Sequence, residues 1–350
     1  MVTVALDVMG GDNCPVSTIK GAVKALGENK EVFIKLYGPE DTIREELKKY
    51  PDADSSRYEI IDAPDTITAE EHPVSAVRSK KNSSICKGVT AVKKGEADAF
   101  VSAGSTGAVL AAGIFRGGRI KGVMRSPLAL IMPTLTGNCL LLDCGANVDA
   151  RPEWLCQFAR MGAIYSEKFM NVKEPSVKLL NIGTEAEKGN ALIKAAAPML
   201  AQMKGINYQG FIESRDIIYG GADVVVTDAF TGNAVLKMFE GTALGLMKLI
   251  KDTLKNGGLK TKLGALLIMP SLKAALKKFD AKEHGGAPML GLNGLVVKCH
   301  GNASEMEICN SILECISFSK LGINELIEKG LAEDSAIYAG AEEENGKKEA

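Results

Sequence analysis

Short apolar runs and segments with apolar residues at helical spacing alternate along most of the chain. Residues 2–8 and 32–37 have the composition of buried strands, and residues 15–26 and 39–50 have the spacing of amphipathic helices. Strands and helices that alternate at this interval are typical of βαβ units. The pattern predicts an α/β fold: a Rossmann-like α/β/α sandwich on a mostly parallel sheet, as one large domain or two lobes around a cleft.

The same alternation continues toward the end of the chain. Further strands are expected at residues 99–101, 140–142, 177–180, 224–226 and 294–297, and further helices at residues 85–94, 108–115, 154–169, 190–203, 303–320 and 323–329. Residues 339–350 read AGAEEENGKKEA, and we expect the chain from residue 336 to residue 350 to form a disordered tail.

The stretch 223–241 reads DVVVTDAFTGNAVLKMFEG and combines a buried strand, a polar turn and the start of a helix. Thr231 or Asn233 is expected to cap this helix. The first turn of a helix attracts anions because its backbone N–H groups are unpaired. Asp228, Thr231, Asn233 and Lys237 add a carboxylate, a hydroxyl, an amide and an ammonium to this corner. The stretch is a candidate anion site, although an ordinary capped turn would show the same pattern.

Other apolar runs also end in polar, glycine-rich turns, at residues 9–12, 102–107, 143–147 and 181–185. In an open parallel sheet these turns would share one edge, at the carboxyl ends of the strands, where such folds bind ligands. Lys298, His300 and Gly301 follow the strand at 294–297 at the same edge. His300 is equally suited to transferring a proton and to a structural hydrogen bond.

The composition argues against several classes of function. The formal net charge is -1 and aromatic residues make up 5%, so neither a global charge nor stacking platforms point to nucleic acid. The eight cysteines form no CxxC pair and the three histidines are scattered, so we expect no metal site. Cys144 remains an alternative nucleophile if a histidine approaches it in space. With no signal peptide and no run long enough to span a bilayer, a cytoplasmic protein is expected.

Residues 257–280 have a different character and predict a protruding amphipathic helical hairpin. One helix is expected to carry an apolar face and to end before Pro270, where a second helix begins. An apolar stripe with basic flanks suits a membrane surface or an acidic partner, whereas a dimer contact with solvated lysines is the plainer alternative. The candidate contact residues are Lys260, Lys262, Leu263, Leu266, Leu267, Lys273, Leu276, Lys277 and Lys278.

Eight ordered motifs carry a resemblance to a known family: DVMGGD, SAGSTGA, LLDCGAN, NIGTEAEKG, RDI, TDAFTGN, GGAPMLG and KCHG. Over roughly residues 1–330 the chain resembles the PlsX family, the phosphate acyltransferases of bacterial phospholipid synthesis. The resemblance implies a catalytic domain over residues 1–335 with a fold similar to phosphotransacetylases and to isocitrate and isopropylmalate dehydrogenases.

The resemblance also implies an activity: transfer of a fatty acyl group from acyl carrier protein to inorganic phosphate. The acyl phosphate would serve glycerol-3-phosphate acylation. It implies a homodimer that attaches reversibly to the inner face of the membrane, in contact with the downstream membrane acyltransferase. No cofactor, no metal and no nucleic acid partner are expected.

The implied reaction suggests a role for each polar residue of these turns. Asp228, Lys188, His300 and Asn233 are the expected catalytic residues: Asp228 or His300 would handle protons, and Lys188, with Lys237, would compensate the phosphate charge. Asp7, Asp12, Asp143 and Glu185 would orient these lysines. The expected phosphate- and substrate-binding residues are Asp7, Gly10, Gly11, Asp12, Ser105, Thr106, Asp143, Asn147, Asn181, Glu185, Thr231, Gly232 and Lys237.

Rival functions use the same cleft differently. A CoA-dependent phosphotransacylase would keep phosphate and change the donor. An NAD-dependent dehydrogenase would favour GxGxxG after the first strand, and DVMGGD is not that motif. A non-enzymatic membrane adaptor would explain the hairpin but would leave the polar turns without a role.

Overall fold

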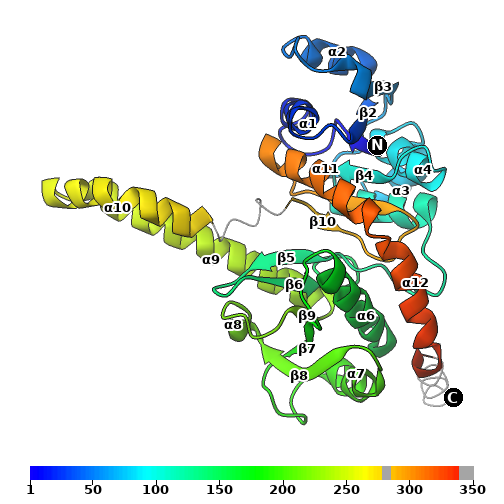
Figure 1. Ribbon diagram of the computed structural model, residues 1–350, viewed down its shortest axis with the longest axis vertical. Helices are drawn as coiled ribbons and strands as arrows, with labels where there is room; N and C mark the ends of the chain where they lie inside the picture. Colours follow the sequence, from blue (N-terminus) through cyan, green and yellow to red (C-terminus); the bar gives the residue numbers. More distant parts are fainter. Residues whose placement is uncertain (278–284, 339–350) are drawn as a thin grey trace.

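The computed structural model describes residues 1–277 and 285–338, with side chains through residue 272 and again from residue 285. Its strands form two sheets rather than one, and each sheet with its helices makes one lobe (Figure 1). The expectation that all the polar turns share one edge is therefore wrong. The turns are divided between two sheets, and the lobes bring their edges together.

The first lobe contains a sheet of six strands in the order β10-β11-β4-β1-β2-β3. All neighbours pair in parallel except β10 with β11. The strands are β1 (Val2–Asp7), β2 (Val32–Gly38), β3 (Tyr58–Asp62), β4 (Ala99–Ser102), β10 (Ala287–Pro288) and β11 (Leu295–Lys298). The chain thus returns to the first sheet after completing the second, which ties its two halves together.

The second lobe contains a sheet of five strands in the order β5-β6-β9-β7-β8, in which only β5 and β6 pair antiparallel. These are β5 (Leu130–Pro133), β6 (Asn138–Leu142), β7 (Ser176–Asn181), β8 (Asn207–Glu213) and β9 (Val224–Val226). The sequence pattern predicted β6, β7 and β9. It did not predict β5 and β8, which lie at the two edges of the sheet.

Helices cover both faces of the sheets because successive strand residues face opposite sides. Val4 and Leu6 enter one apolar cluster and Ala5 enters the other. In the first lobe α1 packs along α11 on one face, while α4 packs against β1, β2 and β4. The helices of the two lobes are α1 (Val16–Glu28), α2 (Glu40–Leu47), α3 (Pro73–Ser79), α4 (Ser84–Lys93), α5 (Thr106–Ala112), α6 (Pro152–Lys168), α7 (Ala191–Gln202), α8 (Ser214–Ile217), α11 (Glu305–Lys320) and α12 (Ile323–Glu333), with a 3-10 turn at Ser55–Arg57 and a π turn at Gly113–Gly117.

A long arm projects from the junction of the lobes, formed by the outer part of α9 (Ala229–Asn256) and by α10 (Leu259–Lys277) (Figure 1). The two helices contact each other and are separated only by Gly257 and Gly258. The predicted break at Pro270 is wrong, because α10 runs through this proline as one helix. Leu244, Leu249 and the candidate contact residues Lys260, Lys262, Leu263, Leu266 and Leu267 are exposed. Lys273, Leu276 and Lys277 lie on α10 without described side chains, and Lys278 and residues 339–350 lie outside the described ranges.

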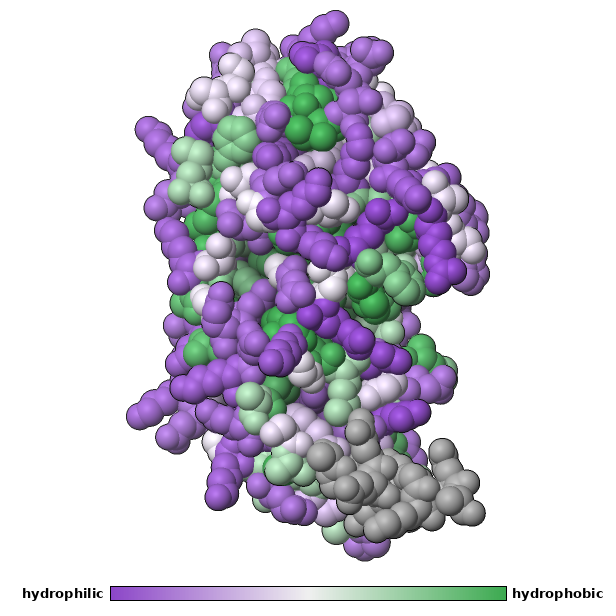
Figure 2. Space-filling view, turned by 90° about the vertical axis from the view of Figure 1, so that its right-hand side faces the viewer, coloured by the Kyte–Doolittle hydropathy of each residue, from purple (hydrophilic) through white to green (hydrophobic). Residues whose placement is uncertain are grey.

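The opposite face of the molecule has another character. In Figure 2 hydrophilic residues predominate, and the apolar ones are scattered among them. Among the described residues, no helix is long and apolar enough to cross a bilayer. The exposed leucines of the arm, in contrast, lie on helices that project away from the two lobes (Figure 1).

A buried ion pair fixes the last described helix to the second lobe. Arg160 of α6 donates from Nε to Asp334 Oδ2 at 2.7 Å and from Nη2 to Asp334 Oδ1 at 2.8 Å. The two side chains are 6% and 4% exposed. Arg160 also donates to the carbonyls of Lys204 and Gly205, and Tyr338 donates to Asp334. The chain after α11 thus descends along α6 and is anchored there by a bidentate pair.

Candidate active site

Three neighbouring strands of the first sheet end side by side. In the register Lys298 ends β11 opposite Ser102 of β4, and Asp7 ends β1 on the other side of β4. Ser102 Oγ donates to Asp7 Oδ2 at 2.7 Å, and Met9 N donates to Asp7 Oδ1 at 3.2 Å. Burial raises the pKa of Asp7, and hydrogen bonds from Ser84 and Ser102 oppose that rise. Asp7 is therefore held beneath the turn that follows β1, and it forms no ion pair with Lys188 or Lys237.

The turn at residues 9–12 requires glycine because other backbone lies close to it. A Cβ at Gly10 would stand 2.5 Å from Asp7 Oδ2 and 2.7 Å from the backbone nitrogen of Gly104. Gly11 has φ +91°, a region that favours glycine. Asp12 N donates to the carbonyl of Gly301 at 2.8 Å, while its side chain is exposed. The turns after β1, β4 and β11 therefore meet, as their positions at strand ends predicted.

Ser105 and Thr106 open α5 at this meeting point. Ser105 is the N-cap residue, and its side chain forms no capping hydrogen bond. Thr106 is exposed and Ser105 is half-buried. Both residues are at least partly accessible to solvent, and their predicted role in binding substrate stays a prediction.

In the second lobe, Asp143 organises the turn after β6. Its Oδ1 accepts hydrogen bonds from the backbone N–H groups of Leu128, Gly145 and Ala146, each at 3.0 Å. Its Oδ2 accepts from Asn147 N at 2.8 Å and from Asn147 Nδ2 at 2.6 Å. Burial raises the pKa of Asp143, and these hydrogen bonds act in the opposite direction. The expected role of orienting a lysine is wrong, because the carboxylate is occupied by its own turn.

The first turn of α9 packs directly on that turn. Ala229 N donates to the carbonyl of Asn147 at 2.9 Å, and Asn147 Nδ2 also donates to Ser126 O at 3.0 Å. A Cβ at Gly232 would stand 2.0 Å from the carbonyl oxygen of Asp143, so only glycine permits this approach. Asn147 and Gly232 therefore connect the two turns. This role is structural, and their predicted role in binding substrate stays a prediction.

Asp228, rather than Thr231 or Asn233, is the N-cap of α9. Its Oδ1 accepts from Thr231 N and its Oδ2 accepts from Thr231 Oγ1, both at 2.8 Å. The capping prediction is wrong because the carboxylate is three residues before Thr231, the spacing that an N-cap side chain bridges. The single hydroxyl proton of Thr231 is used for Asp228, so this hydroxyl cannot also donate to phosphate in this arrangement.

The loop after β7 carries an exposed ion pair. Lys188 Nζ lies 2.7 Å from Glu185 Oε1, and both side chains are about half exposed. The hydrogen bond to Glu185 raises the pKa of Lys188. The buried Asn181 donates from Nδ2 to the carbonyl of Lys188 at 3.3 Å. The expectation that Glu185 orients Lys188 agrees with this geometry, and Asn181 shapes the loop that carries them.

Asn233 and Lys237 are four residues apart and share one exposed face of α9. Lys237 Nζ lies 3.1 Å from Glu240 Oε2. Lys237 is about 13 Å along the helix from Asp228, so it does not share the corner of the cap. The charge of Lys237 affects Lys298 in the first lobe. Burial lowers the pKa of Lys298, and the charge of Lys237 lowers it further.

His300 is exposed at the end of the first-lobe edge. Its Nδ1 accepts from Asn302 N at 3.2 Å, so the neutral ring carries its proton on Nε2. Its own backbone N–H donates to Glu307 Oε1 at 2.6 Å. The position fits the predicted proton-transfer role, which stays a prediction.

Cys144 is not suited to nucleophilic attack. The thiol is buried, and burial raises its pKa well above the usual range, helped by the charge of Asp143. Its Sγ donates to the carbonyl of Leu141. The cysteine alternative is therefore wrong. Within the described ranges no cluster of histidine, cysteine and carboxylate side chains could hold a metal ion.

Two residues were not assigned a role from the sequence. Ser102 is a polar residue that ends an apolar strand, and its partner Asp7 is distant in sequence. Lys298 directly follows Leu295, Val296 and Val297 and is almost fully buried. A polar side chain at the last position of an apolar strand was the available signal for both.

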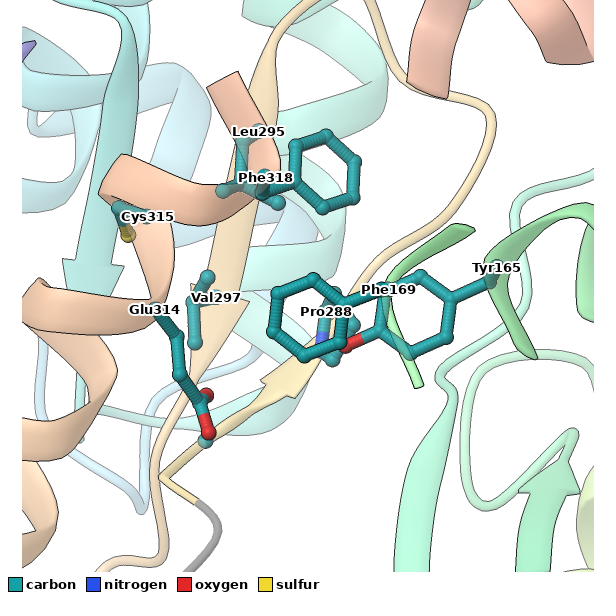
Figure 3. A pocket seen from close by; sticks show the side chains of 9 residues that line it. Tyr165, Phe169, Pro288, Leu295, Val297, Glu314, Cys315 and Phe318 are labelled. Carbon is teal, nitrogen blue, oxygen red and sulfur yellow. The ribbon is translucent and has the colours of Figure 1, made fainter. Parts of the chain in front are cut away.

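A small cavity between the lobes is a separate feature (Figure 3). It has a volume of about 10 Å³ and is lined by Tyr165 of α6, by Phe169 directly after α6, and by Val297 and Phe318 of the first lobe. The carboxyl group of Glu314 also lines it. Burial raises the pKa of Glu314 to about 9. This volume admits about one water molecule, so the cavity is not the substrate site.

Known proteins share both the sequence and the fold. A family model described as "Fatty acid synthesis protein" matches residues 2–326. A phosphate acyltransferase of Clostridium botulinum is 47% identical over 326 residues, which cover 93% of this chain and 98% of that protein. A phosphate acyltransferase of Lactiplantibacillus plantarum is 46% identical over 316 residues, 89% of each chain.

Solved structures with lower identity share the architecture. A phosphotransacetylase from Streptococcus pyogenes superposes with a TM-score of 0.60 at 17% identity, covering 91% of this chain and 94% of its own. A branched-chain phosphotransacylase from Enterococcus faecalis superposes with a TM-score of 0.55 at 15% identity, covering 91% and 99%. These likenesses confirm the expected α/β fold. Because the family model and the relatives span nearly the whole chain, the chain belongs to the PlsX family of fatty acid synthesis proteins and is an acyltransferase.

Proposed function

We propose that the chain transfers a fatty acyl group from acyl carrier protein to inorganic phosphate, for use in phospholipid synthesis. Curated relatives are named phosphate acyltransferase, which supports phosphate as the acceptor. The observation that carries the carrier-protein donor is the arm. It presents exposed leucines beside Lys260 and Lys262, and no acidic residue occurs between Asp252 and Asp280.

The proposed reaction needs no covalent enzyme intermediate. An oxygen of hydrogen phosphate attacks the thioester carbonyl, a new carbon–oxygen bond forms, and the carbon–sulfur bond breaks. The proton of hydrogen phosphate passes to the departing thiolate, so the products are an acyl phosphate and a thiol. The protein must hold the phosphate beside the carbonyl and stabilise the developing negative charge.

The site residues divide these tasks. Lys188 and Lys237 are exposed cations on the second-lobe side, and we assign them the compensation of phosphate charge. Asn233, Ser105 and Thr106 carry side-chain donors, and we assign them the hydrogen bonds to the oxyanion. His300 is assigned the proton transfer to the thiolate. Asp228 caps α9 and therefore acts through the helix instead of on the proton.

The reaction and its donor are tested together. Purified protein is incubated with long-chain acyl carrier protein and phosphate, and acyl phosphate is trapped with hydroxylamine, in parallel with the matching acyl-CoA. Phosphate-dependent product from the carrier-protein donor supports the proposal. Product from CoA alone would move the assignment to a CoA-dependent phosphotransacylase, and no product from either donor would refute it.

The role of the arm is tested by charge reversal. Acyl carrier protein is acidic, so Lys260→Glu with Lys262→Glu should raise the KM for it, most strongly at low salt. The matched control reverses Lys194 and Lys329, which are exposed on α7 and α12. Equal KM values in the arm variant and the control would contradict docking at the arm.

We further propose that the arm mediates a homodimer and reversible attachment to the inner face of the membrane, near the acyltransferase that uses the product. Its exposed leucines support both. Sedimentation of the protein would show a dimer, and flotation with anionic vesicles would show membrane binding. Leu263→Ser with Leu267→Ser should weaken whichever contact these side chains make, and an unchanged dimer and unchanged flotation would refute both.

A further inference from the structure

Lys298 is a buried cation without a direct carboxylate partner. Only 8% of the residue is exposed. Its Nζ donates to the carbonyl of Ala103 at 3.4 Å and to the carbonyl of Cys299. Asp7 and Glu307 are close enough to raise its pKa by their charge, yet across the described residues no carboxylate reaches ion-pairing distance of Nζ. Its contacts therefore come from two neutral carbonyls.

Such an arrangement is energetically unfavourable unless an anion completes it. A buried ammonium loses its hydration, and neutral carbonyls replace that hydration only in part. Lys188 and Lys237 differ on both points, because they are exposed and paired with Glu185 and Glu240. A negative charge bound next to Lys298 would gain more than one bound next to either of them, since water screens it less.

The position of Lys298 identifies where that anion would sit. Its contact Ala103 belongs to the turn after β4, and a Cβ at Gly11 would stand 2.9 Å from Ala103 Cβ and 2.7 Å from Gly301 O. Lys298 thus lies where the turns after β1, β4 and β11 meet. The charge of Lys237, on the second lobe, also lowers the pKa of Lys298. An anion bound next to Lys298 would therefore interact with the buried ammonium first and with the exposed one second.

We propose that Lys298 is a phosphate-binding residue of this acyltransferase, and that it holds inorganic phosphate at the carboxyl ends of β11 and β4. The assignment rests on phosphate being the acyl acceptor, as proposed above. The alternative is a purely structural lysine that bridges the turns at Ala103 and Cys299.

The test removes the ammonium and keeps the shape of the chain. Lys298→Met should raise the KM for phosphate about ten- to hundredfold, the usual value of a hydrogen bond to a charged group, and leave the KM for the acyl donor within about twofold. The Tm without phosphate should not fall, because an apolar residue of similar volume replaces an incompletely paired charge. The rise in Tm that inorganic phosphate gives the wild type should disappear. Lys237→Met is the matched control, with a smaller rise in phosphate KM because this lysine is exposed.

Three results would overturn the proposal. The first is an unchanged phosphate KM together with an unchanged phosphate-induced Tm. The second is a lower Tm with an unchanged phosphate KM, which is the signature of a structural lysine. The third is failure of both Lys298→Met and Lys298→Gln to fold. Phosphate-induced stabilisation is measured without an acyl donor, so a wild type that binds phosphate but transfers no acyl group would refute the proposed function and not the role of Lys298.

Discussion

A substitution at Asp143 would distinguish a structural role from a substrate-binding role. The sequence predicts a substrate-binding carboxylate, whereas the structure shows one occupied by its own turn. Asp143→Asn replaces one carboxylate oxygen by an NH₂ group and changes the volume very little. If that group takes the place of Oδ2, it faces Asn147 N and Asn147 Nδ2, which are both donors. The variant therefore loses two hydrogen bonds and places donors against each other.

The magnitude follows from those two contacts. A hydrogen bond to a charged acceptor contributes about 1.5–3 kcal/mol, so the loss of two destabilises the protein by about 3–6 kcal/mol. Burial raises the pKa of Asp143, which shows that desolvation offsets part of the gain, so we expect about 3 kcal/mol. The Tm should fall by roughly 4 °C, because the entropy of unfolding grows with chain length and is about 0.7 kcal/mol/K for 350 residues. Activity should fall with it, because the carbonyl of Asn147 holds the first turn of α9.

The assay is thermal unfolding beside steady-state kinetics, with Asp12→Asn as the control. Asp12 belongs to the same expected set, yet its side chain is exposed, so the same change should shift stability by less than about 0.5 kcal/mol. A Tm for Asp143→Asn within about 1 °C of the wild type, with a raised phosphate KM, would show that Asp143 contacts substrate and would refute the reasoning.

Three further changes test other parts of the structure. Asp334→Leu leaves Arg160 buried and unpaired and should destabilise the protein by about 3–5 kcal/mol in urea unfolding, and adding Arg160→Met should restore most of the loss. Burial raises the pKa of Glu314 from its ordinary value of 4.5 to about 9 in the folded chain, so the native state retains a proton that the unfolded state releases. Stability should therefore fall as pH rises from about 4.5 to 9, and Glu314→Gln should flatten that slope in urea unfolding at several pH values. Gly232→Ala should lower both Tm and activity, because its Cβ would stand 2.0 Å from the carbonyl of Asp143.

Each of these expectations has a contrary outcome. Additive losses for Arg160 and Asp334 would show that the two side chains do not act as a pair. Parallel pH profiles for the wild type and the Glu314 variant would show that water reaches this partly exposed carboxyl and keeps its pKa ordinary. A wild-type Tm for the Gly232 variant would show that α9 can move away from the turn after β6.

The sequence predicted the α/β class and most elements because local patterns determine them. The runs at β1, β2, β4, β6 and β9 are short and apolar, as buried parallel strands are. The division into two sheets was not predictable, because strand order depends on contacts between distant segments. Lys298 pairs in register with Ser102, nearly two hundred residues earlier.

The candidate site shows the same limit. The positions of the polar turns followed from the strand ends, but the use of each side chain did not. Asp228 and Asp143 look alike in sequence, as carboxylates after apolar runs, and both bind backbone N–H groups of their own turns. Whether a carboxylate faces a ligand or its own backbone depends on a few dihedral angles that residue spacing does not specify. Helix α10 gives another example: Pro270 predicted a break from its sequence context, yet the helix continues through it.

Helix α9 runs without interruption from the candidate site to the arm (Figure 1). Its first turns carry Asn233 and Lys237 between the lobes, and its last turns lie on the arm, where leucines face solvent. From Gly232 to Asn256 the helix is about 36 Å long, so a tilt of about 5° around its fixed first turn displaces the outer end by about 3 Å. The helix is a lever whose short end lies in the site and whose long end meets the surroundings. A force applied at the arm would therefore be transmitted along one continuous helix to the turn that carries Lys237.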